Sequence, residues 1–339
     1  MLHRFVSTGP FELENGRILP QLEISYHTYG ELAPDGSNVV WVCHALTANS
    51  DAEAWWPGLV GAGAAITPEK YFIVCANILG SCYGSSGPHT LDPATGKPLH
   101  NNFPAVTIRD MVKAHILLRE QLGISKIALC MGGSMGGYQA MEWALAEPAV
   151  IGKLFLAATS AAESAWGIAV HEAQRMAIEA DASWTADQPG AGSNGLKAAR
   201  AIGMLTYRNY TAMVQQQSDN DAGKLDNFRA ASYIRHQGDK LAARFNAQSY
   251  WILTKSMDSH NISRGRHGSI TDILATIAQP TLVLGITSDL LCPTIEQQKL
   301  ASAIPNATYV EIDSMYGHDG FLVEATQISE YVQNWMENK

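Results

Sequence analysis

A serine stands among glycines in the segment Gly132-Gly-Ser134-Met-Gly136. The preceding residues 126–130 (Lys-Ile-Ala-Leu-Cys) predict a buried strand, and residues 138–146 predict a helix. A G-x-S-x-G turn between a strand and a helix is typical of a nucleophile elbow, in which crowding strains the serine backbone and favours glycine neighbours. The alternatives are a glycine-rich loop that only turns a corner or a phosphate-binding loop, but no G-x-x-x-x-G-K-[ST] pattern is present. We therefore predict that Ser134 is a nucleophile for acyl transfer.

A serine nucleophile needs a base within hydrogen-bond reach and a carboxylate that orients this base. In sheets that present a nucleophile elbow, the acid and then the histidine follow the serine along the chain, each just after a strand. Asp289 follows the buried run 280–286, and His318 follows the strand-like run 307–312. We therefore predict a triad of Ser134, Asp289 and His318. Asp313 is a less favoured acid, because its closeness to His318 in sequence makes a rigid orienting contact harder to arrange.

The negative oxygen formed during acyl transfer needs two hydrogen-bond donors. The residue after the nucleophile and a loop after an early strand supply them in such folds, which predicts the backbone N–H groups of Leu46 and Met135. His44 ends that early strand, and ordering the loop is a better interpretation of it than catalysis. The sequence contains no metal-binding motif and no dinucleotide fingerprint, so we expect no metal and no permanently bound cofactor.

Elements that could position these residues alternate along the chain. Strand-like runs cover residues 22–29, 38–43, 71–76, 153–158, 280–286 and 307–312, and residues 108–122 predict a helix before the elbow strand. This order predicts an α/β fold of the α/β-hydrolase type, with a mostly parallel, doubly wound sheet. Residues 164–268 are rich in helix formers and predict a helical lid insertion. The expected organisation is therefore a core of residues 1–163 and 269–339 with the lid between them.

Composition limits the possible partners and locations. The 339 residues are 46% hydrophobic and have a formal net charge of −9, which argues against nucleic-acid or anionic-membrane binding. No apolar run is long enough to span a membrane, and the first residues lack the apolar core of a signal peptide, so we expect a cytoplasmic protein. The five cysteines show no C-x-x-C spacing and are expected to be reduced. Cys82 lies in a loop and could line a pocket.

The chain resembles the homoserine O-acetyltransferase family over nearly its full length. The resemblance rests on several blocks that occur in order: Cys43-His-Ala-Leu-Thr47, residues 77–88, Gly133-Ser-Met-Gly-Gly137, Leu205-Thr-Tyr-Arg208, Ser288-Asp-Leu-Leu-Cys-Pro293 and residues 316–322. It implies a ping-pong reaction in methionine biosynthesis. Ser134 would take an acetyl group from the co-substrate acetyl-CoA, and the hydroxyl of L-homoserine would then attack the acyl-enzyme with His318 as base.

The resemblance also implies residues that bind the acceptor. Arg200 corresponds to the residue that binds the homoserine carboxylate, Tyr207 lies beside it, and Asp319 corresponds to the residue that binds the ammonium group. A guanidinium can bind a carboxylate through two hydrogen bonds, and a carboxylate next to the base would hold the amine close to it. The alternatives are a surface helix position for Arg200 and packing within the lid for Tyr207.

Several alternatives stay open at the level of sequence. The segment Thr47-Ala-Asn-Ser-Asp51 replaces the expected Thr-Gly-Asp, and Gly80-Ser-Cys82 replaces Gly-Gly-Cys, so succinyl-CoA as donor or serine as acceptor remains possible. An ester or thioester hydrolase would use the same triad, and a noncatalytic binding protein is the alternative from another class. Apolar residues of the lid suggest that it joins two copies into a homodimer; these are Trp166, Ile168, Met176 and Ile178.

Overall fold

A computed structural model describes residues 1–186 and 188–337. Asp187, within the expected lid, and residues 338–339, within the expected core, lie outside the described residues. The main sheet has eight strands in the order β1-β4-β6-β5-β7-β8-β9-β10. These are β1 (Leu2–Val6), β4 (Glu23–Tyr29), β5 (Val39–Cys43), β6 (Phe72–Ala76), β7 (Ile127–Gly133), β8 (Ile151–Ala157), β9 (Thr281–Ile286) and β10 (Ala307–Ile312).

Six of these strands, from β6 through β10 in sheet order, pair in parallel. β4 is antiparallel to β6, and β1 is antiparallel to β4. The mostly parallel sheet expected from the sequence is therefore confirmed. Strand β1 was not predicted, because its side chains alternate between exposed and half-buried positions at the sheet edge and include Arg4. A separate small hairpin joins β2 (Phe11–Glu12) to β3 (Ile18–Leu19).

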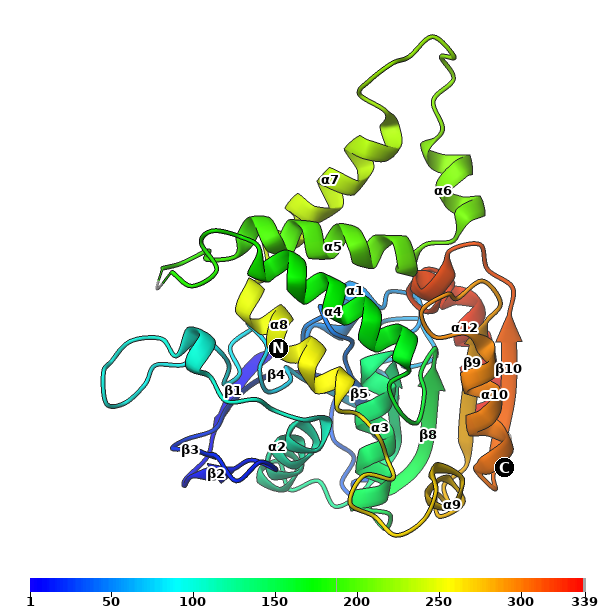
Figure 1. Ribbon diagram of the computed structural model, residues 1–339. Coiled ribbons are helices and arrows are strands. Elements are labelled where there is room, and N and C mark those ends of the chain that lie inside the picture. The colour runs from blue at the N-terminus through cyan, green and yellow to red at the C-terminus, as the bar shows by residue number, and fades with distance from the viewer. Residues whose placement is uncertain (187, 338–339) are drawn as a thin grey trace.

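Helices cover both faces of the sheet (Figure 1). One hydrophobic cluster includes side chains of α2 (Ile108–Gln121), α3 (Met135–Ala146), α9 (Ile270–Leu274) and α10 (Thr294–Ala303). The other cluster includes α1 (Ala52–Trp55), α11 (Gly320–Val323) and α12 (Ala325–Glu337). Two short 3-10 helices, η1 (His100–Asn102) and η2 (Gly317–Asp319), complete this part of the chain. All five side chains of β5 are buried, as expected for an inner strand covered on both sides.

Helix starts follow local sequence signals. The Thr107 side chain accepts a hydrogen bond from the Asp110 N–H, and the Asp110 carboxylate accepts one from the Thr107 N–H, so the two form a capping box for α2. Ser164 caps α4 (Ala165–Glu179) by accepting from the N–H of Gly167. Such caps satisfy N–H groups that have no partner within the helix. They fix where α2 begins and where α4 begins after the chain leaves β8.

The chain between β8 and α9 is helical. It contains α4, α5 (Ser193–Tyr207), α6 (Tyr210–Gln217), α7 (Arg229–Ala242) and α8 (Ala247–Asp258). The arrows of β8 and β10 point toward the end of the sheet where α4 and α5 lie, and α6 and α7 project away from the body (Figure 1). Helices therefore stand at the carboxyl ends of the strands, where sheets of this type form their sites. None of the described helices has the length and apolar character needed to span a membrane.

Candidate active site

Ser134 lies at the junction of β7 and α3 with backbone angles φ 54° and ψ −126°. This region is strained for a residue with a side chain. The turn is held by hydrogen bonds from the Ser134 N–H to the Ala157 carbonyl (2.9 Å) and from the Thr159 hydroxyl to the Ser134 carbonyl (2.8 Å). A Cβ atom at Gly136 would lie 2.1 Å from the Cys43 carbonyl oxygen, so only glycine fits there. The local sequence thus produces the sharp turn expected of a nucleophile elbow.

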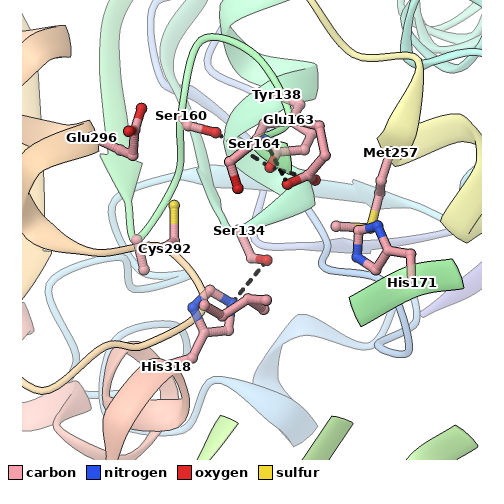
Figure 2. A pocket seen from close by; sticks show the side chains of 12 residues that line it. Ser134, Tyr138, Ser160, Glu163, Ser164, His171, Met257, Cys292, Glu296 and His318 are labelled. Carbon is pink, nitrogen blue, oxygen red and sulfur yellow. Dashed lines mark hydrogen bonds between the residues drawn. The ribbon is translucent and has the colours of Figure 1, made fainter. Parts of the chain in front are cut away.

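The structure brings together the three residues expected to form the triad. His318 Nε2 lies 2.9 Å from the Ser134 hydroxyl oxygen, and His318 Nδ1 lies 2.7 Å from Asp289 Oδ2 (Figure 2 draws the first bond). The other oxygen of Asp289 accepts hydrogen bonds from the N–H groups of Leu291 and Cys292, both at 2.8 Å. This arrangement fixes the carboxylate. It favours the tautomer in which Nδ1–H donates to Asp289 and Nε2 can accept the serine proton.

The side chain of His318 is buried. Burial alone would lower its pKa, but the charge and hydrogen bond of Asp289, together with the charges of Asp319 and Glu163, outweigh burial, so the pKa of His318 is raised above the usual 6.5. Asp313, the second candidate for the acid, is exposed, and its carboxylate accepts a hydrogen bond from the Thr287 hydroxyl at 2.9 Å. The geometry therefore favours Asp289 over Asp313 as the residue that orients His318.

Leu46 and Met135 lie on two segments that a buried amide joins. The Gln139 side-chain NH₂ donates to the His44 carbonyl at 3.1 Å and to the Met135 carbonyl at 3.2 Å. His44 Nε2 in turn accepts the Ile78 N–H at 3.1 Å, and burial lowers the pKa of His44 to about 4, which keeps the ring neutral. His44 thus orders the loop, as its position in the sequence suggested. The loop and the first turn of α3 are held beside each other, which suits a shared oxyanion site.

The residues expected to bind the acceptor lie around the same void as the serine. Arg200, Tyr207 and Asp319 line a cavity of about 460 Å³ together with Ser134 and His318. The Arg200 guanidinium carbon stands 5.2 Å from the centre of the Tyr207 ring, a cation–π contact, and the Tyr207 ring centre lies 5.9 Å from that of His318. Arg200 is half-buried on α5. It faces the void that contains the predicted nucleophile.

Three basic residues at or next to this void were not predicted from the sequence. Lys240 of α7 and Arg244 line the void, and Arg244 donates to the Tyr83 hydroxyl and the Thr47 carbonyl. Arg208 does not line it, but its guanidinium lies 3.4 Å from the carboxylate of Asp319, which does. Arg208 stands inside the segment 205–208 on which the family resemblance rests, so that segment contained a usable signal. Lys240 and Arg244 lie far from any motif.

The four histidines of residues 164–268 and the cysteines have other environments. His236 and His267 are exposed, whereas His171 and His260 are buried. Burial raises the pKa of the Cys82 thiol to about 11, which argues against a thiolate nucleophile at neutral pH. All five cysteines are free. Within the described part of the chain, no three His, Cys, Asp or Glu side chains are arranged to hold a metal ion.

Comparisons with known proteins place this site in a family. The family model described as alpha/beta hydrolase fold matches residues 38–325. A homoserine O-acetyltransferase of Cyclobacterium marinum is 45% identical over 335 residues, which cover 98% of this chain and 95% of that protein. The chain belongs to the homoserine O-acetyltransferase family of α/β-hydrolases.

Solved structures extend the likeness to the whole fold. A homoserine O-acetyltransferase from Bacillus anthracis superposes with a TM-score of 0.91 at 24% identity, covering 100% of this chain and 98% of the other. An esterase called E22 superposes with a TM-score of 0.89 at 23% identity, covering 99% and 100% of the two chains. Members of the homoserine O-acetyltransferase family thus share their fold with an esterase, so the fold by itself does not choose between transfer and hydrolysis.

Proposed function

We propose that this protein is a homoserine O-acetyltransferase that moves an acetyl group from acetyl-CoA to the hydroxyl of L-homoserine, a step of methionine biosynthesis. The observation that carries the proposal is the void of about 460 Å³ that Ser134 and His318 line together with a cation, Arg200, and an anion, Asp319. An amino-acid acceptor needs such a pair, whereas a simple ester does not. The name shared by relatives of 41–46% identity supports the same donor and acceptor.

In the first half-reaction, His318 takes the proton of Ser134 while the serine oxygen attacks the thioester carbonyl. The Leu46 and Met135 N–H groups stabilise the resulting oxyanion, and Asp289 stabilises the imidazolium that forms. The C–S bond then breaks, the CoA thiolate leaves with the proton from His318, and Ser134 is left as an acetyl ester. No metal or permanently bound cofactor takes part in this scheme.

In the second half-reaction, homoserine occupies the void that CoA has left. Arg200 binds its carboxylate with Tyr207 alongside, and Asp319 binds its ammonium group. The ion pair between Arg208 and Asp319 holds the Asp319 carboxylate in position. His318 then takes the proton of the homoserine hydroxyl, whose oxygen attacks the acetyl ester and releases Ser134. Residues 164–268 serve as a lid that keeps water from the acyl-enzyme.

The test is the release of CoA thiol from acetyl-CoA or succinyl-CoA, each with homoserine, with serine and without acceptor. We expect steady turnover only with acetyl-CoA and homoserine together. Preference for succinyl-CoA or for serine would contradict the proposal and indicate a sister transferase. Steady release without an acceptor would indicate a thioesterase.

We also propose that the protein acts as a homodimer in the cytoplasm, with the lid helices joining two copies. Trp166, Ile168 and Met176 of α4 are exposed apolar side chains, which supports such an interface. Ile178 does not contribute to it, because the structure buries this residue completely. Exposed apolar residues that the sequence analysis did not select extend this surface over the end of α5, over α6 and over the segment before α7: Leu205, Tyr210, Val214, Leu225 and Phe228. A monomeric mass by analytical ultracentrifugation at micromolar concentration would contradict the dimer.

A further inference from the structure

Two voids meet at Ser134 and His318. The outer void of about 460 Å³ contains the proposed acceptor-binding residues and extends to Lys240 of α7. The inner void is far smaller, about 10 Å³, which is room for about one water molecule. Figure 2 shows the inner void, where Tyr138, Glu163 and Ser164 gather on one side of Ser134. The two voids therefore differ in size and in the chemistry of their walls.

The placement of the donor rests on the proposed function, because that function decides which part of acetyl-CoA enters each void. The thioester carbonyl must reach Ser134 while the long CoA chain extends away from it. Only the outer void is large enough for that chain. The acyl group, on the other side of the carbonyl, then points into the inner void. A methyl group is close to a water molecule in size, so an acetyl group fits this space.

Glu163 lines the inner void with a carboxyl group whose pKa is raised by burial, while the nearby His171 and the hydrogen bonds from Tyr138 and Ser164 oppose that shift. One of its carboxylate oxygens accepts the Tyr138 O–H at 3.0 Å, and the other accepts the Ser164 N–H at 3.0 Å. Tyr138 is itself held by stacking on His260, with ring centres 4.0 Å apart and ring planes 14° apart. Burial lowers the pKa of His318, and the Glu163 charge is among the effects that raise it, after the larger ones of Asp289 and Asp319. The carboxylate thus lies close to the reacting centre and is held in place.

The basic groups near this wall already have acidic partners. His171 lines the inner void, and its Nδ1 lies 2.8 Å from Asp258. Arg175 binds the other oxygen of Asp258 at 2.6 Å and also binds Glu172. A second carboxylate, Glu296, lines the void on the side away from His171. A carboxylate on an acyl chain would therefore meet like charge in a space with little water.

We propose that Glu163 is a specificity-determining residue that rejects acyl donors with a terminal carboxylate, so that acetyl-CoA is accepted and succinyl-CoA is excluded. Like charges placed against an unwanted substrate are an effective way to discriminate, because the cost falls on that substrate alone. The small volume of the void rejects long chains in general, and Glu163 adds a penalty that depends on charge.

The test compares butyryl-CoA with succinyl-CoA. Both acyl chains have four carbons, but only the succinyl chain ends in a carboxylate. The rate of CoA release in the first turnover, without acceptor, measures acylation of Ser134 alone. We expect the wild-type protein to react faster with butyryl-CoA. Glu163→Gln keeps the size of the side chain and removes its charge, and should lower the butyryl-to-succinyl rate ratio about tenfold. Glu163→Ala should lower it as well, at higher rates for both donors.

Glu172→Gln is the matched control, because it removes a glutamate charge from α4 at a side chain that is 53% exposed and outside both voids. Its donor ratio should equal that of the wild type. An unchanged butyryl-to-succinyl ratio in both Glu163 variants overturns the inference. If the KM for homoserine is also raised in these variants, Glu163 binds the acceptor amine instead. If the wild type releases no CoA from acetyl-CoA, the proposed function fails instead.

Discussion

The sheet core and the helical lid supply different parts of the site and hold them in different ways. The core fixes Ser134, His318 and Asp289 through short hydrogen bonds among buried groups at the ends of β7, β9 and β10. The lid contributes Arg200 and Tyr207 through a cation–π contact on a half-buried helix surface. In the proposed mechanism, chemistry common to many hydrolases therefore lies on the sheet core, and recognition of a particular acceptor lies on the helical segment.

The largest expected effect comes from removing the nucleophile of the core. Ser134→Ala should lower turnover by about 10⁶-fold and abolish the burst of CoA, because no acyl-enzyme can form. Stopped-flow detection of the released thiol measures the burst. Ser302→Ala, at an exposed position of α10, is the control and should retain the wild-type burst. A normal burst in Ser134→Ala would show that the core does not contain the nucleophile.

The next effect concerns the group that orients the base. Asp289→Asn should lower kcat by about 10⁴-fold, because the amide favours the wrong tautomer of His318. Asp289 raises the pKa of His318, so its loss should also move the acid limb of the pH–rate profile to lower pH, since the base then stays neutral further into acid. Asp313→Asn should leave both the rate and the profile as in the wild type. The reverse ranking would assign the orienting role to Asp313.

A lid variant should affect one half-reaction only. Arg200→Ala should raise the KM for homoserine about 10- to 100-fold while the acetyl-CoA burst keeps its wild-type rate, because the guanidinium binds only the acceptor. Lys197→Ala, on the same helix but paired with Asp239, is the matched control. If Arg200→Ala lowers the burst as much as the second half-reaction, Arg200 acts in both steps, which would contradict the separate roles of core and lid.

The last effect concerns the stability of the fold rather than turnover, and it comes from histidines buried in both regions. Burial lowers the pKa of His44 to about 4 and the pKa values of His115 and His260 to about 3, so these rings stay neutral in the fold. In the unfolded chain these histidines bind protons below about pH 6.5. The free energy of unfolding should therefore keep its full value above that pH and should fall on acidification, by about 1.4 kcal/mol per pH unit for each ring that stays neutral in the fold.

Urea unfolding at pH 7.5 and 5.5 measures this effect as a lower midpoint at the acid pH. His115→Phe should reduce the pH dependence, because one buried ring no longer titrates. His236→Phe should leave it unchanged, since His236 is exposed on the lid. Equal midpoints at the two pH values in the wild-type protein would contradict neutral buried histidines.

Sequence could predict the core because its signals are local. Buried runs such as residues 280–286 correspond to strand β9, and the glycines around Ser134 specify one kind of turn. The order of acid and histidine after the serine then selected Asp289 and His318, which the structure places in contact. Edge strand β1 was not predicted, because its apolar and polar residues alternate only weakly and its partner strand β4 lies about 20 residues away in sequence.

The lid was harder to predict because its contacts join distant segments. The pair of Arg208 and Asp319 crosses more than 100 residues of sequence, and no local pattern indicates it. Glu163 likewise gains its surroundings from Tyr138 in α3 and from residues near His260, which are far away along the chain. Composition indicated helices in this region, but it could not show which side chains face the serine or that α6 and α7 project outward.

The left-handed backbone of Ser134 also bears on how this protein can be engineered. Glycine adopts backbone angles of φ 54° and ψ −126° more readily than serine does, so this conformation costs about 1–3 kcal/mol of folding free energy. The rest of the fold holds Ser134 in a backbone conformation that serine disfavours, and this strain lowers the overall stability of the protein. A library screened only for resistance to heat would therefore favour Ser134→Gly, which is inactive. Stabilisation of this enzyme has to be selected together with turnover.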